Sequence, residues 1–349
     1  MTTLETTARA LVAPGKGILA ADESSPTIKK RFDSIGVEST ESKRRDYREF
    51  LFRTPGANEF ISGVILYDET LRQSAASGER LVEVLESAGI LPGIKVDAGA
   101  KALAGSDGEK VTEGLDGLRE RLAEYRELGA RFAKWRAVIT IAGELPSARC
   151  IHVNAHALAR YAALSQEQGV VPIVEPEVLM DGPHTIERCE EVTARTLEAT
   201  FHELFLQGVS LEGMLLKPNM VLSGTECPVQ ASVQQVAEAT VRCFQRHVPA
   251  AVPGVVFLSG GQSDELATAH LNAMNAMGLE LPWQLSFSYG RALQAPALKA
   301  WGGASANVKL AQKAYYHRAK CNGAARNGKY SAAMEREAPT RGGKLVSQD

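Results

Sequence analysis

The chain has 349 residues, of which 44% are hydrophobic, a formal net charge of −2 at pH 7 and a pI of about 6.4. This length allows one large α/β domain or two smaller ones. The balanced charge argues against binding to nucleic acid or to an anionic membrane, and no apolar run is long enough to span a bilayer. The five cysteines are widely spaced without a C-x-x-C pair, which is typical of free thiols in a reducing cytosol. We therefore expect a cytoplasmic protein with neither nucleic acid nor membrane as a partner.

Short apolar strands and helices alternate along the chain, after a helix expected over residues 4–12. The expected strands cover residues 15–22, 63–68, 93–97, 132–138, 170–178, 213–217, 254–260 and 285–289. Apolar residues at helical spacing, together with start signals such as proline turns, predict helices over residues 24–53, 79–88, 114–128, 146–168, 185–206, 233–247 and 264–277, with two more between 291 and 320.

Helix follows each of the eight predicted strands, which indicates a parallel sheet covered on both faces. Eight units favour a (β/α)8 TIM barrel with an extra N-terminal helix, and an open doubly wound sheet is the alternative. Because no linker or repeat divides the chain, residues 1–321 are predicted to form a single barrel domain. From residue 322 onward small and charged residues dominate without a period, which predicts a flexible C-terminal tail over residues 322–349.

Lys217 stands at the end of a predicted apolar strand, directly before Pro218. Proline cannot donate a ladder hydrogen bond, so the strand is expected to end there. Burial favours the neutral amine of a lysine, and a neutral lysine is a nucleophile that can form a Schiff base with a carbonyl. A lysine that reaches solvent or pairs with a carboxylate is the plainer alternative.

Other charged residues lie at the ends of further predicted strands, several of them in i, i+2 pairs that share one face. They are Asp22, the pair Lys95 and Asp97, the pair Lys134 and Arg136, and the pair Glu175 and Glu177. In an open sheet the outer members of this set would lie roughly 25–30 Å apart. In a barrel all of them ring one mouth, where the active sites of barrel enzymes lie. The charge pattern therefore favours both closure and a common site.

Two glycine-containing segments follow the last two predicted strands. Residues 259–263 read SGGQS and open a helix, and residues 289–291 read YGR. Backbone N–H groups at glycines, helix N-termini and arginine all bind phosphate, so a phosphate site is expected here.

Two other patterns are rejected as cofactor or metal sites. The GKGILA segment at residues 15–20 fits a dinucleotide fingerprint but leads into a strand, and His152 and His156 lack the H-E-x-x-H context of zinc ligands.

Taken together, these segments resemble the class I fructose-bisphosphate aldolases over nearly the whole chain. The motifs that carry the resemblance stand in family order: GILAADES, GIKVD, FAKWR, VPIVEPE, LLKPNM, LSGGQS, FSYGRALQ and ALKAWGG. The resemblance implies a (β/α)8 barrel, usually homotetrameric, that serves glycolysis and gluconeogenesis. Such an enzyme reversibly cleaves fructose 1,6-bisphosphate to dihydroxyacetone phosphate and glyceraldehyde 3-phosphate, with a covalent Schiff base in place of a metal or other cofactor.

The resemblance also implies roles for individual residues. Lys217 matches the lysine that forms the iminium, and Glu175 matches the acid/base of carbinolamine formation and dehydration. Asp22 matches the carboxylate near the C4 hydroxyl, and Lys134 the lysine beside the Schiff-base nitrogen. Whether Asp22 or Glu175 removes the C4 hydroxyl proton stays open. Glu177 matches a supporting carboxylate.

The remaining matched residues bind substrate. Lys95 and Arg136 match charges that line the cleft. The site for the C1 phosphate is matched by Ser259, Gly260, Gly290 and Arg291, and the region toward the C6 phosphate by Ser24, Thr27, Lys30 and Arg31.

The C-terminal sequence departs from the family pattern. Many vertebrate members end in a tyrosine that reprotonates the enamine, whereas this sequence ends VSQD and has its last tyrosine at position 330. We expect Tyr330 or another acid to take over this step, or the step to be slow. Two alternatives to the bisphosphate aldolase are another Schiff-base enzyme of sugar phosphates, such as a transaldolase, and a scaffold protein that binds actin.

Overall fold

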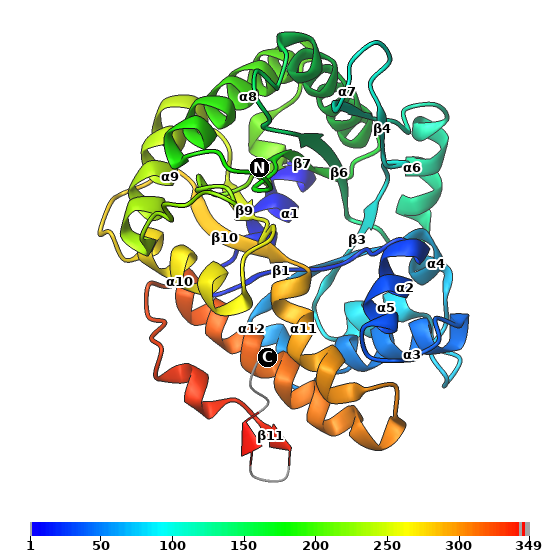
Figure 1. Ribbon diagram of the computed structural model, residues 1–349. Helices are drawn as coiled ribbons and strands as arrows, with labels where there is room; N and C mark the ends of the chain where they lie inside the picture. Colours follow the sequence, from blue (N-terminus) through cyan, green and yellow to red (C-terminus); the bar gives the residue numbers. More distant parts are fainter. Residues whose placement is uncertain (1, 342–343, 346–349) are drawn as a thin grey trace.

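The computed structural model describes residues 2–341 and 344–345, and its centre is a closed barrel of eight parallel strands (Figure 1). The strands follow one another around the barrel in the order β1-β10-β9-β8-β7-β6-β3-β2. Their bounds are Gly17–Ala21 (β1), Ile61–Leu66 (β2), Leu91–Lys95 (β3), Phe132–Ile139 (β6), Val171–Val178 (β7), Leu215–Leu216 (β8), Gly254–Phe257 (β9) and Gln284–Tyr289 (β10). Pairing of β1 with β10 closes the ring, so the predicted (β/α)8 barrel is confirmed and the open sheet is excluded.

Helices surround this barrel (Figure 1). They are Thr3–Leu11 (α1), Ser25–Asp33 (α2), Glu41–Phe52 (α3), Asp68–Arg72 (α4), Leu81–Ser87 (α5), Leu118–Glu127 (α6), Ala148–Glu167 (α7), Ile186–Leu206 (α8), Val233–His247 (α9), Asp264–Asn275 (α10), Arg291–Trp301 (α11) and Val308–Arg326 (α12). The 3₁₀ turns are Ala57–Glu59 (η1), Leu211–Gly213 (η2), Ser305–Asn307 (η3) and Met334–Glu337 (η4). Two small hairpins pair Ala100–Ala102 (β4) with Lys110–Thr112 (β5), and Thr340–Arg341 (β11) with Lys344–Leu345 (β12).

Several helices start where the sequence supplies a capping side chain. The hydroxyls of Ser147, Thr185, Ser232 and Ser263 each accept a hydrogen bond from a backbone N–H in the first turn of α7, α8, α9 and α10. These bonds satisfy N–H groups that have no partner within the helix. The caps therefore fix the point at which the loop after each strand turns into a helix.

Helix α1 closes the N-terminal end of the barrel. Its Leu11 belongs to the same buried cluster as Phe132 and other side chains from the barrel strands. The close approach leaves no room for side chains at two strand positions, because a methyl group on Gly63 would lie 2.7 Å from Leu11 and one on Gly93 would lie 2.3 Å from the Phe132 ring. With this end filled, the loops at the opposite, C-terminal end of the strands are left to form a site.

The C-terminal part of the chain differs from the predicted boundary. Helix α12 continues past residue 321 to Arg326, and the side chain of Asn322 is fully buried, where it accepts a hydrogen bond from the Thr268 hydroxyl. The predicted helix therefore ends too early, because small residues such as Ala324 hid its continuation. The flexibility of the tail stays a prediction, and residues 346–349 lie outside the described part of the chain. No described helix is long and apolar enough to cross a membrane.

Candidate active site

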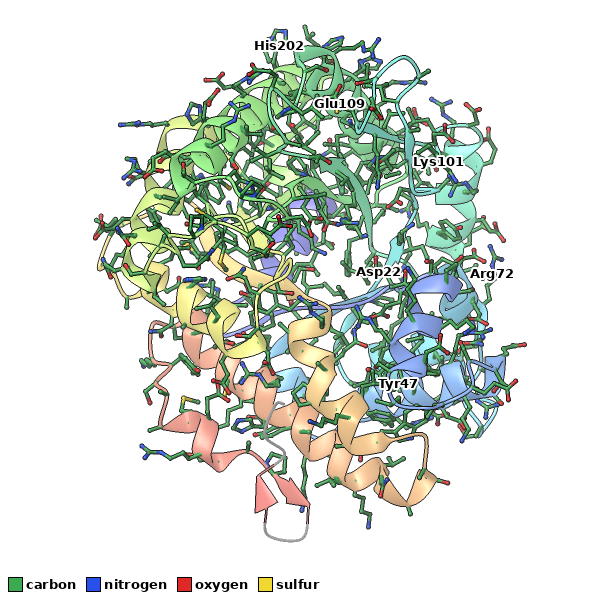
Figure 2. All side chains as sticks on the ribbon, in the orientation of Figure 1. Asp22, Tyr47, Arg72, Lys101, Glu109 and His202 are labelled. Atoms are coloured by element: carbon green, nitrogen blue, oxygen red, sulfur yellow. The ribbon has the colours of Figure 1, made fainter. Side chains whose placement is uncertain are left out.

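One cavity at the C-terminal end of the barrel strands gathers most of the predicted site residues. Its volume is about 450 Å³. The predicted residues in its wall are Asp22, Ser24, Thr27, Arg31, Lys95, Lys134, Arg136, Glu175, Glu177, Lys217, Ser259, Gly260, Gly290 and Arg291. Figure 2 shows Asp22 inside the ring of helices, whereas His202 and Arg72 lie on its outer side. The fold thus brings together strand ends that are far apart in the sequence.

A chain of ion pairs lies in this cavity. Lys134 Nζ is 2.7 Å from Asp22 Oδ2 and 3.5 Å from Glu175 Oε2. The other oxygen of the same carboxylate, Glu175 Oε1, is 3.4 Å from Lys217 Nζ. Both lysines and the glutamate are buried. Two amines therefore flank a single carboxylate, which can exchange a proton on either side.

Strand geometry places these groups. Lys217 follows β8 directly, and its backbone N–H donates to the carbonyl of Val174 at 2.7 Å, which continues the parallel pairing of β8 with β7. Glu175 stands on β7 and Lys134 on the adjacent β6. Pro218 then ends the strand as predicted, because it has no N–H for the ladder. The lysine is held by backbone pairing and not by a mobile loop.

The charges determine which of these groups are ionised. Burial by itself raises the pKa of Asp22, but the positive charges of Lys134 and Lys217 outweigh burial and lower that pKa from 3.8 to about 2. Burial also works against the charged form of Lys134, but Asp22 and Glu175 outweigh it and raise the pKa of this lysine. Asp22 and Lys134 are therefore a charged pair at neutral pH. Among the described residues, Glu175 Oε2 has no hydrogen-bond partner, which leaves it available to substrate.

A second set of charges lies beside the first. The Arg136 guanidinium donates a short hydrogen bond to Glu177, while the backbone N–H of Arg136 donates to Asp97 at 3.3 Å. The other oxygen of Asp97 is 2.7 Å from Lys95 Nζ. Burial raises the pKa of Glu177 in spite of its arginine partner. Each charge here is paired, so these residues set the electrostatic surroundings of the cavity.

The loops after β9 and β10 supply an anion-binding wall. Gly260 has a φ of +57°, which a residue with a side chain rarely adopts, and the loop exposes the backbone next to Ser259. Arg291 begins α11, and its Nη2 donates to the Gly260 carbonyl at 2.9 Å. The guanidinium and the helix N-terminus both favour negative charge at this wall.

A second polar group lies after β1. Ser24 Oγ and Thr27 Oγ1 are 3.1 Å apart at the start of α2, and Arg31 Nη1 is 2.6 Å from Glu23 Oε1. These side chains contact the cavity, whereas the exposed side chain of Lys30 on the same helix is not part of its wall. The structure therefore separates Lys30 from the other predicted phosphate ligands.

The cavity wall also contains residues that the sequence did not suggest, among them Glu23, Met180 and Ser288. Neighbours on a strand point to opposite faces, but β1 ends at Ala21, so Asp22 and Glu23 both line the cavity. Ser288 stands two residues before Gly290, and the same-face rule applied to β10 would have found it. Neither charge nor strand periodicity in the sequence predicts Met180 as a residue of the cavity wall.

Tyr330 does not line the cavity. Its hydroxyl donates to Glu335 at 2.7 Å, and its backbone N–H donates to Asn272 at 2.8 Å. The tyrosine is thus held against α10 and η4, on residues that are not part of the cavity wall.

Fold and site together define a barrel enzyme in which a buried amine, a carboxylate placed to exchange a proton with it and two polar walls able to bind anions share one cavity. The family model described as fructose-bisphosphate aldolase class-I matches residues 3–347, and the chain belongs to this family. It therefore reversibly cleaves fructose 1,6-bisphosphate to dihydroxyacetone phosphate and glyceraldehyde 3-phosphate through a lysine Schiff base, without a metal or other cofactor, and its glycolytic role follows from the same membership.

Individual relatives and a solved structure to which the chain is similar are also described as fructose-bisphosphate aldolases. The chain is 60% identical over 328 residues to a "Probable fructose-bisphosphate aldolase class 1" of Xanthomonas campestris pv. campestris, with 94% of this chain and 98% of the relative covered. It is 58% identical to "Fructose-bisphosphate aldolase 4, cytosolic" of Arabidopsis thaliana, with 91% and 81% covered. A solved structure of the aldolase from Plasmodium falciparum, in complex with TRAP and a small-molecule inhibitor, superimposes with a TM-score of 0.93 at 52% identity and covers 95% of both chains.

Proposed function

We propose that Lys217 is the lysine that forms the Schiff base in this aldolase. The observation that carries the assignment is the pair of contacts on Glu175, whose two oxygens are 3.4 Å from Lys217 Nζ and 3.5 Å from Lys134 Nζ. A carboxylate placed this way can remove a proton from the attacking amine and return it to the departing hydroxyl of the carbinolamine. Glu175 is therefore assigned the proton transfers of imine formation.

Lys134 is assigned an electrostatic role. Its raised pKa keeps the Lys134 amine protonated beside the reacting nitrogen. The fixed positive charge there stabilises the substrate oxygen on which negative charge develops. Lys217 then bonds to the C2 ketone of the sugar, and loss of water gives the iminium that accepts the electrons of the broken C3–C4 bond.

The pKa of Asp22 bears on which group removes the C4 hydroxyl proton. A carboxylate with a pKa of about 2 is a weak base at neutral pH, and efficient general bases have a pKa near the working pH. Asp22 is also held 2.7 Å from Lys134 Nζ, whereas Glu175 Oε2 has no hydrogen-bond partner among the described residues. We assign the C4 proton to Glu175 on this geometry, and to Asp22 the task of orienting Lys134 and the sugar hydroxyls. Glu177, Lys95 and Arg136 keep their supporting roles through the ion pairs at the cavity wall.

The two phosphates are assigned to the two polar walls. Ser259, Gly260, Gly290 and Arg291 receive the C1 phosphate, and Ser24, Thr27 and Arg31 receive the C6 phosphate. To bind this phosphate, Arg31 must break its ion pair with Glu23 or share its guanidinium between the two. The second carboxylate oxygen of Glu23 is buried without a hydrogen-bond partner among the described residues. Because Lys30 lies outside the cavity wall, its contribution to the C6 phosphate is at most a long-range attraction.

The final protonation of the enamine is assigned to an acid of the cavity instead of Tyr330, whose hydroxyl donates to Glu335. We further propose that residues 322–349 act outside this chemistry.

A cytoplasmic homotetramer is the proposed state of the protein. The location is supported by the cytosolic Arabidopsis relative and the assembly by family membership. Light scattering of the purified chain tests the assembly.

Single-turnover kinetics of Glu175→Gln and Lys134→Met test the assignment. Both variants are expected to form the imine with dihydroxyacetone phosphate about 10²–10⁴-fold more slowly. Only Glu175→Gln is expected to slow C3–C4 cleavage by a further factor once the imine has formed. If the preformed imine of Glu175→Gln cleaves the C3–C4 bond at the wild-type rate, the base for the C4 hydroxyl is Asp22 instead.

The relative activity on fructose 1-phosphate and fructose 1,6-bisphosphate in Arg31→Met tests the polar wall after β1. The variant's preference for the bisphosphate should fall.

A further inference from the structure

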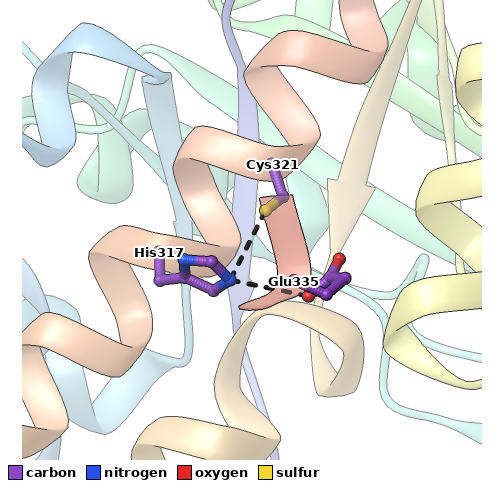
Figure 3. Close-up of side chains that lie close together, drawn as sticks. All are labelled: His317, Cys321 and Glu335. Atoms are coloured by element: carbon purple, nitrogen blue, oxygen red, sulfur yellow. Dashed lines mark hydrogen bonds and ion pairs between the residues drawn. The ribbon is translucent and has the colours of Figure 1, made fainter. Parts of the chain in front are cut away.

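Away from the active-site cavity, three side chains of metal-binding type converge where α12 meets η4 (Figure 3). His317 and Cys321 lie one helical turn apart on α12, and Glu335 reaches them from η4. One ligand atom from each residue lies within 4.8 Å of the other two. His317 and Cys321 are buried, and Glu335 is partly buried. None of the three takes part in the aldolase mechanism above.

Both separations that involve His317 match those of a tetrahedral zinc site, and the third pair of ligand atoms lies within 4.8 Å. The same imidazole nitrogen, His317 Nε2, is 3.6 Å from Cys321 Sγ and 3.5 Å from Glu335 Oε2. With Zn–S bonds of about 2.3 Å and Zn–N and Zn–O bonds of about 2.0–2.1 Å, tetrahedral angles put sulfur and nitrogen about 3.6 Å apart and nitrogen and oxygen about 3.4 Å apart. An ion can therefore bind without rearrangement of α12.

The surroundings hold the carboxylate in place. Arg318 Nη1 is 2.6 Å from both oxygens of Glu335, and the Tyr330 hydroxyl donates to Oε1 at 2.7 Å. Metal-binding carboxylates commonly have such outer hydrogen-bond partners, which orient them.

The ligand set selects the type of ion. A cysteine thiol gives up its proton when its sulfur bonds to zinc. When the Zn–S bond forms, that proton passes to solvent, and thiolate and carboxylate together balance the two positive charges of the ion. Hard ions such as Mg²⁺ and Ca²⁺ prefer oxygen ligands, whereas thiolate and imidazole favour Zn²⁺.

His317 stands in the wall of a cavity of about 590 Å³. The wall also carries Lys309, Lys313 and Lys320, the last of which pairs with Glu337 at 2.9 Å. These positive charges repel free cations, so a cation is not retained here by electrostatic attraction alone. An ion that remains here must be held by bonds to specific ligands.

We propose that His317, Cys321 and Glu335 form a zinc site, separate from the active site, that ties the η4 segment to α12. Zinc there stabilises the C-terminal segment and leaves the Schiff-base chemistry unchanged. The fourth position of the tetrahedron is left to water.

Cobalt substitution in the full chain tests the site, because Co²⁺ bound to thiolate absorbs in the near ultraviolet. After chelator treatment and desalting, the wild-type chain is expected to bind one Co²⁺ with this absorption, and Zn²⁺ is expected to displace it. Cys321→Ser should abolish the absorption and weaken Zn²⁺ binding at least about 100-fold, since even the loss of an outer partner typically costs 10–100-fold. Glu335→Gln should keep the absorption and bind more weakly.

Cys243→Ser is the matched control, because Cys243 is also fully buried on a helix and lies outside the cluster. It is expected to bind as wild type does. If Cys321→Ser does not fold, mapping of alkylated peptides replaces it: Zn²⁺ should protect Cys321 and no other cysteine. Absence of the thiolate absorption in the wild type, unchanged binding in Glu335→Gln, or protection of a different cysteine would overturn the proposal.

Discussion

Replacing Asp22 with asparagine removes one anion from the ion-pair chain and keeps the shape of the side chain. The folded structure lowers the pKa of Asp22 from 3.8 to about 2, and one pKa unit corresponds to about 1.4 kcal/mol. The ionised carboxylate therefore stabilises the folded chain by about 2 kcal/mol at neutral pH, and the Asp22→Asn variant is expected to lose about that much free energy of unfolding.

The loss should depend on pH in a defined direction. Because the pKa of Asp22 in the folded chain lies below its unfolded value, its contribution is complete above about pH 4 and disappears as the pH falls toward 2. Urea titrations of both proteins at pH 7, 5 and 3 measure the difference, which should shrink at the lowest pH. Asp33→Asn is the control: Asp33 forms an exposed pair with Lys29 on α2, and its loss should cost less than about 0.5 kcal/mol.

The same variant should lose activity. Without Asp22 the amine of Lys134 loses its ion pair at 2.7 Å and keeps the longer one to Glu175 at 3.5 Å, so its position beside the imine changes. We expect kcat for cleavage of fructose 1,6-bisphosphate to fall about 10²–10⁴-fold in a coupled assay. A wild-type kcat, or a difference in unfolding free energy that stays constant from pH 7 to pH 3, would refute the reasoning.

Three further predictions follow from other parts of the chain. Arg291→Gln should raise KM for the bisphosphate about 10–100-fold, whereas Lys30→Met, outside the cavity wall, should change it less than about threefold. Tyr330→Phe should leave kcat unchanged and lower the unfolding free energy by about 1 kcal/mol, through loss of the bond to Glu335; a fall in kcat would restore Tyr330 as the proton donor. Gly93→Ala should cost about 1–3 kcal/mol in urea titrations because its methyl would lie 2.3 Å from Phe132, and an unchanged value would show that the ring moves freely.

Strand periodicity predicted which charged side chains share one cavity, because barrel strands alternate their faces strictly. Glu175 and Glu177 both point into the cavity from β7, as their spacing predicts, and Lys217 ends its strand where Pro218 requires it. The eight barrel strands were likewise located by apolar runs, since both faces of such a strand are buried. Periodicity does not predict which charged side chains form ion pairs with one another, because those pairs depend on which strands are neighbours in the barrel.

The sequence was less informative where structure is set by packing. Glu23 and Ser288 belong to the cavity wall, and neither was predicted from the sequence. The end of α12 was missed because Ala and Gly around Asn322 suggest a loop, whereas burial against Thr268 makes that residue part of a helix. The sequence predicted only free thiols, because the fold and not a local motif brings Cys321 beside His317 and Glu335.

Borohydride reduction in the presence of dihydroxyacetone phosphate and EDTA tests the identity of the reacting amine most directly. We expect one reduced adduct per chain, located on Lys217 by mass spectrometry of the peptides. The chelator should not reduce the yield, since neither the Schiff base nor its formation uses a metal. An adduct on Lys134 or any other lysine, or an adduct lost on chelation, would contradict the assignment.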